Sequence, residues 1–354
     1  PARNRLNRAL DLAREAGDKK LEAQATGNLG VVLRNLGRVE EARDHHERAL
    51  ALAREIGDRS WEAVATGNVG VALSSLGRHD EARDRLERSL DLACALGDRV
   101  QEGRTLDSLG VLFYSLGRYE RARGFHERSL AVEQEIGNRR GQALSVAYLG
   151  RILSQLGRHG QAREHLDRAL VLAREVGDRR LESDALHGSA EAAERAGRDD
   201  DAERLYADAL TLRREVGSGP RVAATLVAKG RLETGRGLAE AATAHLAEAA
   251  GLGREFHLPR TLLLAAAYRA LLPEGDPAAA VAALEAHRQG VDHVTRMEAR
   301  FVLWRVTGER AHAEEAHRLL SALCDRAPED CRGSMTDAVP LHREILSAWE
   351  QARG

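Results

Sequence analysis

The sequence predicts an all-α right-handed solenoid of about seven or eight helical pairs, and three observations lead to this prediction. Glycines recur every 40 residues in three series, which begin at Gly17, Gly30 and Gly37. Between these glycines, apolar residues such as Val69 and Leu73 recur at helical spacing. No segment shows the alternating pattern of a β-strand. Repetition at a period of roughly 20–50 residues is typical of a solenoid, because each unit buries its apolar face against the next.

The helical pair can be followed within one 40-residue unit. A first helix is predicted between Asp58 and Gly77, and a second helix from about 79 to 96. Asp58 and Asp98 are suitable N-caps, because a short carboxylate accepts hydrogen bonds from the free N–H groups at a helix start. Gly77 and Gly97 can end the two helices, since glycine readily adopts the positive φ that a helix C-terminus favours.

The chain is expected to have a regular part and a diverged part. Residues 1–256 are predicted to form the regular array, with a truncated first unit, because the opening residues match a second helix. Residues 257–354 are expected to form diverged helical pairs and a C-terminal capping helix from about 339 to 350, after Pro328 breaks the pattern. The missing first helix leads us to expect that the chain is a piece of a longer protein.

The composition limits the possible classes of function. The 53 basic and 55 acidic residues give a net charge of −2, which argues against a nucleic-acid or anionic-membrane partner. The most apolar run, from 261 to 272, contains Arg269 and is shorter than the ~18 residues of a membrane helix, so a buried helix is predicted. The three cysteines form no CxxC pair, which indicates a reducing, cytoplasmic compartment. Arginine greatly outnumbers lysine, which indicates a GC-rich bacterial gene.

Residues at fixed positions of the repeat point to a known family. Leu29, Gly30 and Leu33 in the first helix, and Ala42 and Ala49 in the second, recur with similar residues 40 positions later. In this pattern the chain resembles the tetratricopeptide repeat family, although the usual period of that family is about 34 residues. The longer period is similar to that of kinesin light chains, of cell-polarity adaptors and of C-terminal arrays in large bacterial signalling proteins.

This resemblance implies a non-catalytic scaffold that binds a protein or peptide in the concave groove lined by first helices. It also implies an upstream effector domain in the same full-length chain, an NTPase, kinase or cyclase, for which the array is the sensing or docking arm. Two alternatives stay open. The groove could close on a small molecule or a short signalling peptide, or the array could be an arm for oligomerisation.

Each first helix carries three residues beside its apolar stripe, and the equivalent residues of successive repeats form three columns. Within one helix the three positions are three and four residues apart, which keeps them on one face. They are neutral in the first three units and mixed in charge in the fourth to sixth. An asparagine amide both donates to and accepts from an extended backbone, and the resemblance gives Asn28 and Asn68 this role. The alternative is that they cap or bridge neighbouring helices. The predicted groove residues are Asn28, Val31, Asn35, Asn68, Val71, Ser75, Ser108, Tyr148, Arg151, Gln155, Glu191, Arg195 and Arg231.

Reactive residues show no pattern of an active site. The sequence contains no GxSxG, no phosphate-binding loop and no HExxH. His187 and Glu191 are four residues apart but lack a third ligand, and they are predicted at the surface. Four more histidines recur only because the repeat recurs, and they are predicted to be solvated or half-buried: His45, His46, His126 and His165. We therefore expect no catalytic residues, no metal site and no cofactor.

Overall fold

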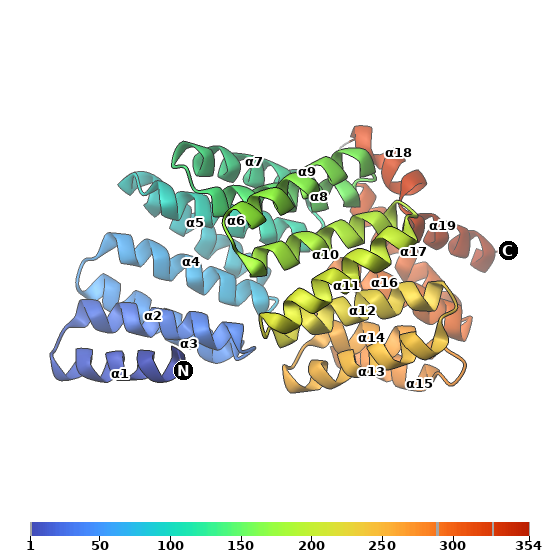
Figure 1. The fold of residues 1–354 in the computed structure, drawn as a ribbon, viewed down its shortest axis with the longest axis horizontal. Coiled ribbons are helices and arrows are strands. Elements are labelled where there is room, and N and C mark those ends of the chain that lie inside the picture. Colours follow the sequence, from blue (N-terminus) through green and yellow to red (C-terminus); the bar gives the residue numbers. More distant parts are fainter. Residues whose placement is uncertain (1, 288–289, 328, 354) are drawn as a thin grey trace. The chain divides into compact units, whose positions relative to one another are not determined.

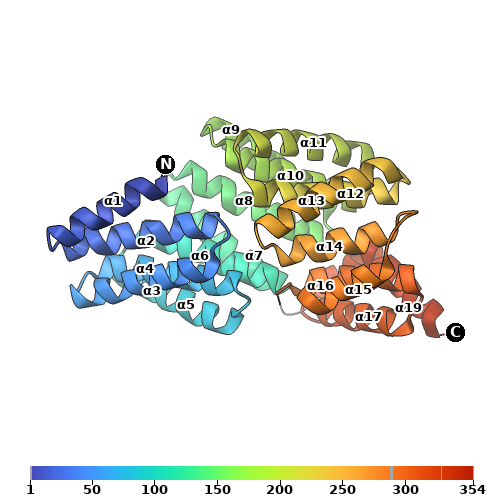
Figure 2. The same ribbon diagram turned by 90° about the horizontal axis from the view of Figure 1, so that it is seen from below.

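The computed structural model describes residues 2–287, 290–327 and 329–353, and every regular element in these ranges is an α-helix (Figure 1). Consecutive helices pack side by side and are joined by short turns (Figure 2). The structure thus confirms the predicted all-α class and its helical pairs. The predicted break at Pro328 lies outside the described residues.

The chain divides into two units, which we call unit 1 (residues 1–112 and 125–141) and unit 2 (residues 113–124 and 142–354). Unit 1 contains α1 (Ala2–Glu15), α2 (Lys19–Asn35), α3 (Val39–Glu55), α4 (Arg59–Ser75), α5 (His79–Leu96), and most of α6 (Arg99–Ser115) and α7 (Tyr119–Glu135). Unit 2 contains the remaining ends of α6 and α7, most of α8 (Arg139–Gln155), and α9 (His159–Glu175), α10 (Arg179–Arg195), α11 (Asp199–Glu215), α12 (Gly219–Gly235), α13 (Ala239–Glu255), α14 (Pro259–Ala270), α15 (Pro277–His287), α16 (His293–Thr307), α17 (Arg310–Cys324), α18 (Glu329–Ala338) and α19 (Pro340–Arg353).

The predicted caps define the helix boundaries. Asp58 Oδ1 accepts a hydrogen bond from the backbone N–H of Trp61 at 2.9 Å, and Asp98 caps the next first helix in the same way. Gly77 and Gly97 have φ values of 77° and 65°, in the region where a side chain would be strained. These caps hold α4 and α5 at the boundaries that the sequence predicts.

The core of each pair depends on a close approach at one first-helix position. At Gly70 an added Cβ would lie 2.7 Å from Cγ of Leu86 in the paired helix, too close for van der Waals contact. At Gly30 the corresponding second-helix residue is His46, and an added Cβ would lie 2.6 Å from its ring. The predicted exposure of His46 is therefore wrong. The side chain is 1% exposed, because the imidazole fills the space opposite the glycine.

The predicted exposure of His126 is wrong for the same reason. Its ring packs against Gly110, where an added Cβ would lie 2.5 Å from Nε2, and its Nδ1 lies 3.1 Å from a carboxylate oxygen of the buried Asp107. His45 and His165 are half-buried, as predicted. The repeat thus accepts either leucine or histidine opposite its glycine.

The C-terminal helices agree with the sequence except for one addition. Helix α14 covers 261–270 of the buried helix predicted over 261–272, α16 and α17 are two helices in contact, and α19 covers the stretch expected to form the final helix. Helix α18 was not predicted. Its Ser334 hydroxyl donates to the carbonyl of Leu156 at 2.5 Å, and Arg158 donates to the carbonyl of Asp330 at 2.8 Å. Helix α18 therefore contacts the turn between α8 and α9, far from it in sequence.

Candidate functional site

Six of the predicted groove residues lie on three neighbouring first helices of unit 2. Tyr148, Arg151 and Gln155 come from α8, Glu191 and Arg195 from α10, and Arg231 from α12. Their spacing of three, four or seven residues within a helix keeps them on one face. We call these six residues, with the side chains that contact them, the unit 2 cluster.

Arg151 lies against two aromatic rings whose centroids are 6.0 Å apart. Its guanidinium carbon lies 5.1 Å from the ring centroid of Tyr114 and 5.4 Å from that of Tyr148, within cation–π range. Its Nη2 lies 3.5 Å from Oε2 of Glu191. Gln155 Nε2 donates to the Tyr114 hydroxyl at 3.1 Å, which fixes one of the two rings. These contacts restrict the position of the guanidinium before any ligand arrives.

Glu191 and His187 are buried, so their predicted surface position is wrong. Their exposed fractions are 7% and 9%, and the His187 ring lies 5.5 Å from the Tyr206 ring. Burial, the largest single influence, raises the pKa of Glu191, but the positive groups around it, Arg151 foremost, together lower this pKa below its ordinary value, so the carboxylate stays ionised. Burial lowers the pKa of His187 well below its ordinary value, so its imidazole is neutral at pH 7.

A second set of charges joins α12 to α10 and α16. Arg231 donates to both carboxylate oxygens of Glu194, at 2.8 and 2.6 Å, and to Glu298 Oε1 at 3.1 Å. The hydroxyl of Tyr206 donates to Glu194 at 2.7 Å, and that of Tyr268 donates to Glu298 at 2.6 Å. Every charge in this set therefore has a partner.

Sequence reasoning missed five residues of the unit 2 cluster, namely Tyr114, Glu194, Tyr206, Tyr268 and Glu298. Two signals were present. Tyr268 lies 120 residues after Tyr148, in the same column of the 40-residue repeat. Tyr206 lies opposite Ala190, at the position where other 40-residue repeats carry glycine.

The predicted groove residues of unit 1 have a different character. Asn28 is exposed, and Asn68, Val31 and Val71 are half-buried. Neither asparagine side chain forms a hydrogen bond within the described part of the chain, so neither caps nor bridges a neighbouring helix there. Two of the other predicted residues are occupied by their own helix, because Ser75 donates to the carbonyl of Val71 and Ser108 to that of Arg104. Asn35 is exposed.

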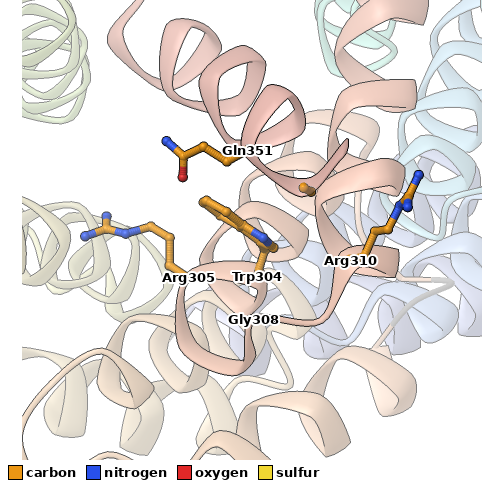
Figure 3. Close-up of a pocket in the computed structure, with 6 residues that line it drawn as sticks. Trp304, Arg305, Gly308, Arg310 and Gln351 are labelled. Atoms are coloured by element: carbon orange, nitrogen blue, oxygen red, sulfur yellow. The ribbon is translucent and has the colours of Figure 1, made fainter. Parts of the chain in front are cut away.

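One surface hollow lies at the C-terminal end of unit 2 (Figure 3). Its volume is about 580 Å³, and it is lined by Trp304, Arg305, Gly308, Arg310, Gln351 and Ala352. Figure 3 shows the Arg305 and Arg310 side chains pointing away from the Trp304 indole on opposite sides. None of the predicted site residues lines this hollow, so it is separate from the unit 2 cluster.

Two kinds of site are not found in the part of the chain that the structure describes. No three histidine, cysteine, aspartate or glutamate side chains there come close enough to hold a metal ion. None of the described helices combines the length and apolar character needed to cross a membrane.

Comparison with solved structures gives relatives in fold. A Rap protein complexed with Competence and Sporulation Factor is 12% identical, covers 99% of this chain and 98% of its own, and has a TM-score of 0.61. The Rap conjugation gene regulator of the plasmid pLS20, in complex with the Phr* peptide, is 12% identical over 99% and 96% of the two chains, with a TM-score of 0.60. Aspartyl phosphate phosphatase F from Bacillus subtilis is 11% identical over 99% and 91%, with a TM-score of 0.53. At these identities the likeness is one of fold.

Comparison by sequence gives the family. No curated protein matches the chain. The family described as Tetratricopeptide repeat matches residues 2–55, 21–95, 63–135 and 141–215, which together are more than half of the chain. These segments contain the glycines, caps and small core residues described above. The chain therefore belongs to the tetratricopeptide repeat family.

Proposed function

We propose that this chain is a protein- or peptide-binding scaffold without catalytic activity, and that its ligand lies along the first-helix faces. The observation that carries this proposal is the unit 2 cluster. It gathers tyrosine, arginine and glutamate on three adjacent first helices, at positions that unit 1 fills with asparagine, valine and serine. A helical core does not need such residues, whereas tyrosine and arginine are enriched among the residues that dominate binding energy at interfaces.

The chemistry of both faces suits an extended peptide. In unit 1, Asn28 and Asn68 each offer an amide that can donate to and accept from a peptide backbone. In unit 2, the faces of Tyr114 and Tyr148 and the guanidinium of Arg151 offer stacking and charge. Two structures of similar fold were solved with Competence and Sporulation Factor and with the Phr* peptide, which supports a peptide as the ligand.

We extend the proposal to the cellular setting. The 40-residue period resembles that of arrays in large bacterial signalling proteins, where the array follows an NTPase, kinase or cyclase domain. On this basis the chain is the sensing or docking arm of such a protein in the cytoplasm. Coding sequence for an effector domain upstream of Pro1 in the natural gene is the expected finding, and a start codon directly before Pro1 would contradict it.

A sensor of a small molecule is the second candidate. The observation that favours it is the contact of α18 with the turn between α8 and α9, which brings segments about 175 residues apart together within unit 2. A ligand that binds between such segments could change their spacing without a long groove. Affinity that grows with peptide length would favour the scaffold, and length-independent affinity would favour the sensor.

Substitutions on the two helix faces test the scaffold. Peptides selected by display against the full chain would be titrated against Asn68→Ala, Arg151→Ala and Arg85→Ala. We expect the first two to weaken binding by roughly 1–3 kcal/mol, the usual cost of leaving a polar partner unsatisfied. Arg85 is the control, because it lies on a second helix and pairs with Glu47 at 3.4 Å on the surface. Loss of affinity in Arg85→Ala alone would place the ligand on the other face.

A further inference from the structure

Helix α18 is fastened to the turn between α8 and α9 by one of its faces. Asp330, Ser334 and Ala338 are spaced four residues apart, so they lie on the same side of the helix. Arg158 donates to the carbonyl oxygen and to Oδ2 of Asp330, at 2.8 and 3.1 Å. The Ser334 hydroxyl donates to a backbone carbonyl of the turn at 2.5 Å, and the His159 imidazole donates to the Ala338 carbonyl at 3.0 Å. The contact therefore runs along most of the length of α18.

The repeat that contains α9 lacks an acidic residue that three other repeats carry. At the starts of α3, α5 and α11, the turn arginine pairs with an acid three positions later, as Arg78 does with Glu81 at 2.6 Å. The residue at that position of α9 is Gln161, so Arg158 has no such acid in its own helix. Asp330 of α18 supplies the carboxylate instead. The sequence of this repeat is thus suited to a helix that brings its own acid to the turn.

A glycine of the turn allows the close approach of α18. Gly157 has a φ of 74°, and an added Cβ would lie 2.3 Å from the carbonyl oxygen of Ser334. The equivalent glycine of the next repeat, Gly197, has a φ of 70°, but an added Cβ there would meet no atom of the described residues within 4 Å. The space beside Gly157 is therefore taken by α18 and not by the turn itself.

Helix α18 is held mainly by polar contacts. Of its ten residues, all within the described ranges, only Cys331 and Met335 are buried. The side chains of the Arg158–Asp330 ion pair are 39% and 75% exposed. An exposed ion pair contributes little to stability, and an element with few buried apolar side chains opens at a low cost in free energy. Helix α18 can therefore leave the turn while the rest of unit 2 stays folded.

Little of the unit 2 cluster is open to a ligand while the C-terminal helices are in place. Glu298 of α16 lies 3.1 Å from Arg231 of α12, and their side chains are 5% and 20% exposed. Glu191 of α10 is also buried. A peptide that lies along the first-helix faces of α10 and α12 therefore needs the C-terminal helices to move away from them.

We propose that α18 is a strap that holds the C-terminal helices over the first-helix faces of unit 2, and that it leaves the α8–α9 turn before a peptide reaches the unit 2 cluster. This inference rests on the peptide-binding function proposed above. The strap connects the turn to α17 and α19, the helices before and after it in the chain. Its release frees these helices to move as well.

Two alanine variants that share the same backbone strain test the strap. Gly157→Ala and Gly197→Ala both place a side chain at positive φ, but only the first puts a Cβ against α18. Both are made in the full chain with Cys94→Ser and Cys324→Ser, so that alkylation of the remaining thiol, Cys331, reports the release of α18. We expect at least about tenfold faster alkylation in Gly157→Ala than in Gly197→Ala, because a side chain forced into a packed contact favours the open form. Equal rates would overturn the strap.

The association rate of a peptide tests the access role of α18. The probe is a peptide selected by display against the full chain, and its association with each immobilised variant is followed by surface plasmon resonance. We expect the association rate to rise in Gly157→Ala by about the same factor as the alkylation rate, because the binding-competent fraction rises in the same proportion. Faster alkylation with an unchanged association rate would overturn the access role and leave the scaffold standing. If display selects no peptide, the scaffold falls and the access role falls with it, whereas alkylation still decides whether α18 is released.

A second pair of variants gives the answer if circular dichroism shows that Gly157→Ala does not fold. Arg158→Gln removes the ion pair with α18, whereas Arg198→Gln removes the equivalent pair within α11 and its turn, with Asp201 at 3.2 Å. We expect roughly twofold to fivefold faster alkylation in Arg158→Gln and no change in Arg198→Gln, in line with the contribution of an exposed ion pair. The same alkylation rate in both variants would overturn the strap.

Discussion

In unit 1 the first-helix columns carry asparagine, valine and serine, whereas the same positions of the repeat carry tyrosine, arginine and glutamate in unit 2. Both units nevertheless form the same helical pair, with the same glycine in the turns and a small residue at the close approach. The residues that define the pair are thus separate from those that define the face. One helical frame can therefore present a neutral face in one unit and a charged face in the other.

At one close approach the packing core is connected to the charged face. In unit 1, Gly30 packs against His46 and Gly70 packs against Leu86. In unit 2, Gly150 and Gly230 pack against leucines in the same way, but in the pair of α10 and α11 the first-helix residue is Ala190 and the second-helix residue is Tyr206, which is 0% exposed. The Tyr206 hydroxyl reaches Glu194 and so joins the packing core to the charges of α12 and α16. Removal of those charges should therefore affect stability as well as binding.

The largest effect is expected from Arg231→Met. This change leaves Glu194 and Glu298 without their cation in a site where their side chains are 17% and 5% exposed. Removing one partner of a buried ion pair costs roughly 3–5 kcal/mol, because a charge stays buried without compensation. Hydrogen exchange followed by mass spectrometry should show faster exchange in unit 2.

The matched change in unit 1 is Arg78→Met. Arg78 pairs with Glu81 at 2.6 Å, but the two side chains are 44% and 57% exposed, so water replaces the lost partner. We expect no measurable change in the urea midpoint or in exchange. Equal losses of stability from Arg231→Met and Arg78→Met would show that the charges of unit 2 do not support its packing.

Sequence reasoning predicted the helical pairs because their signals are local. A cap such as Asp58 and a turn glycine such as Gly77 act within a few residues of themselves, and each is repeated every 40 positions. Helix α18 escaped prediction because only Cys331 and Met335 are buried along it, too few for an apolar stripe.

The site was harder to predict, because burial depends on what another helix presents. His46 is buried because Gly30 lies opposite it on the paired helix. Glu191 can be buried because Arg151 and His187 lie within 3.5 and 3.7 Å of its carboxylate oxygens. The contact of Arg231 with Glu298 spans 67 residues, which is not a multiple of the repeat, since the C-terminal helices depart from the 40-residue period. The columns predicted which residues share a face, but not which of them pair.

A smaller effect, dependent on pH, is expected from His46→Leu. Burial, and then the charge of Arg34, lowers the pKa of His46 to about 4, from 6.5. The unfolded chain therefore binds more protons between these values, so stability is full above pH 6.5 and falls as the pH drops toward 4. The loss between pH 7 and 5 is about 2 kcal/mol. Leucine should remove that loss, and the next 40-residue repeat, also in unit 1, carries a leucine at this position as Leu86.

Unit 2 provides the comparison for this measurement. Burial likewise lowers the pKa of His342 to about 4, so unit 2 should keep its sensitivity to acid in the His46→Leu variant. Urea unfolding at pH 7 and 5, with hydrogen exchange read separately for the two units, measures both. An unchanged pH dependence of unit 1 in His46→Leu would mean that another group controls its acid sensitivity.

The smallest effect is expected at one N-cap position that differs between the units. Asp58 caps α4 in unit 1, whereas Ser218, at the equivalent position before α12, makes no side-chain capping hydrogen bond. Asp58→Ala should cost about 1 kcal/mol, the usual contribution of an N-cap, and Ser218→Ala should cost almost nothing. Ser218→Asp should stabilise unit 2 by about 0.5–1 kcal/mol, because the N–H of Arg221 is in position to donate to the new carboxylate. Urea midpoints of the three variants measure these differences, and a loss from Ser218→Ala as large as that from Asp58→Ala would show that the two caps do not differ.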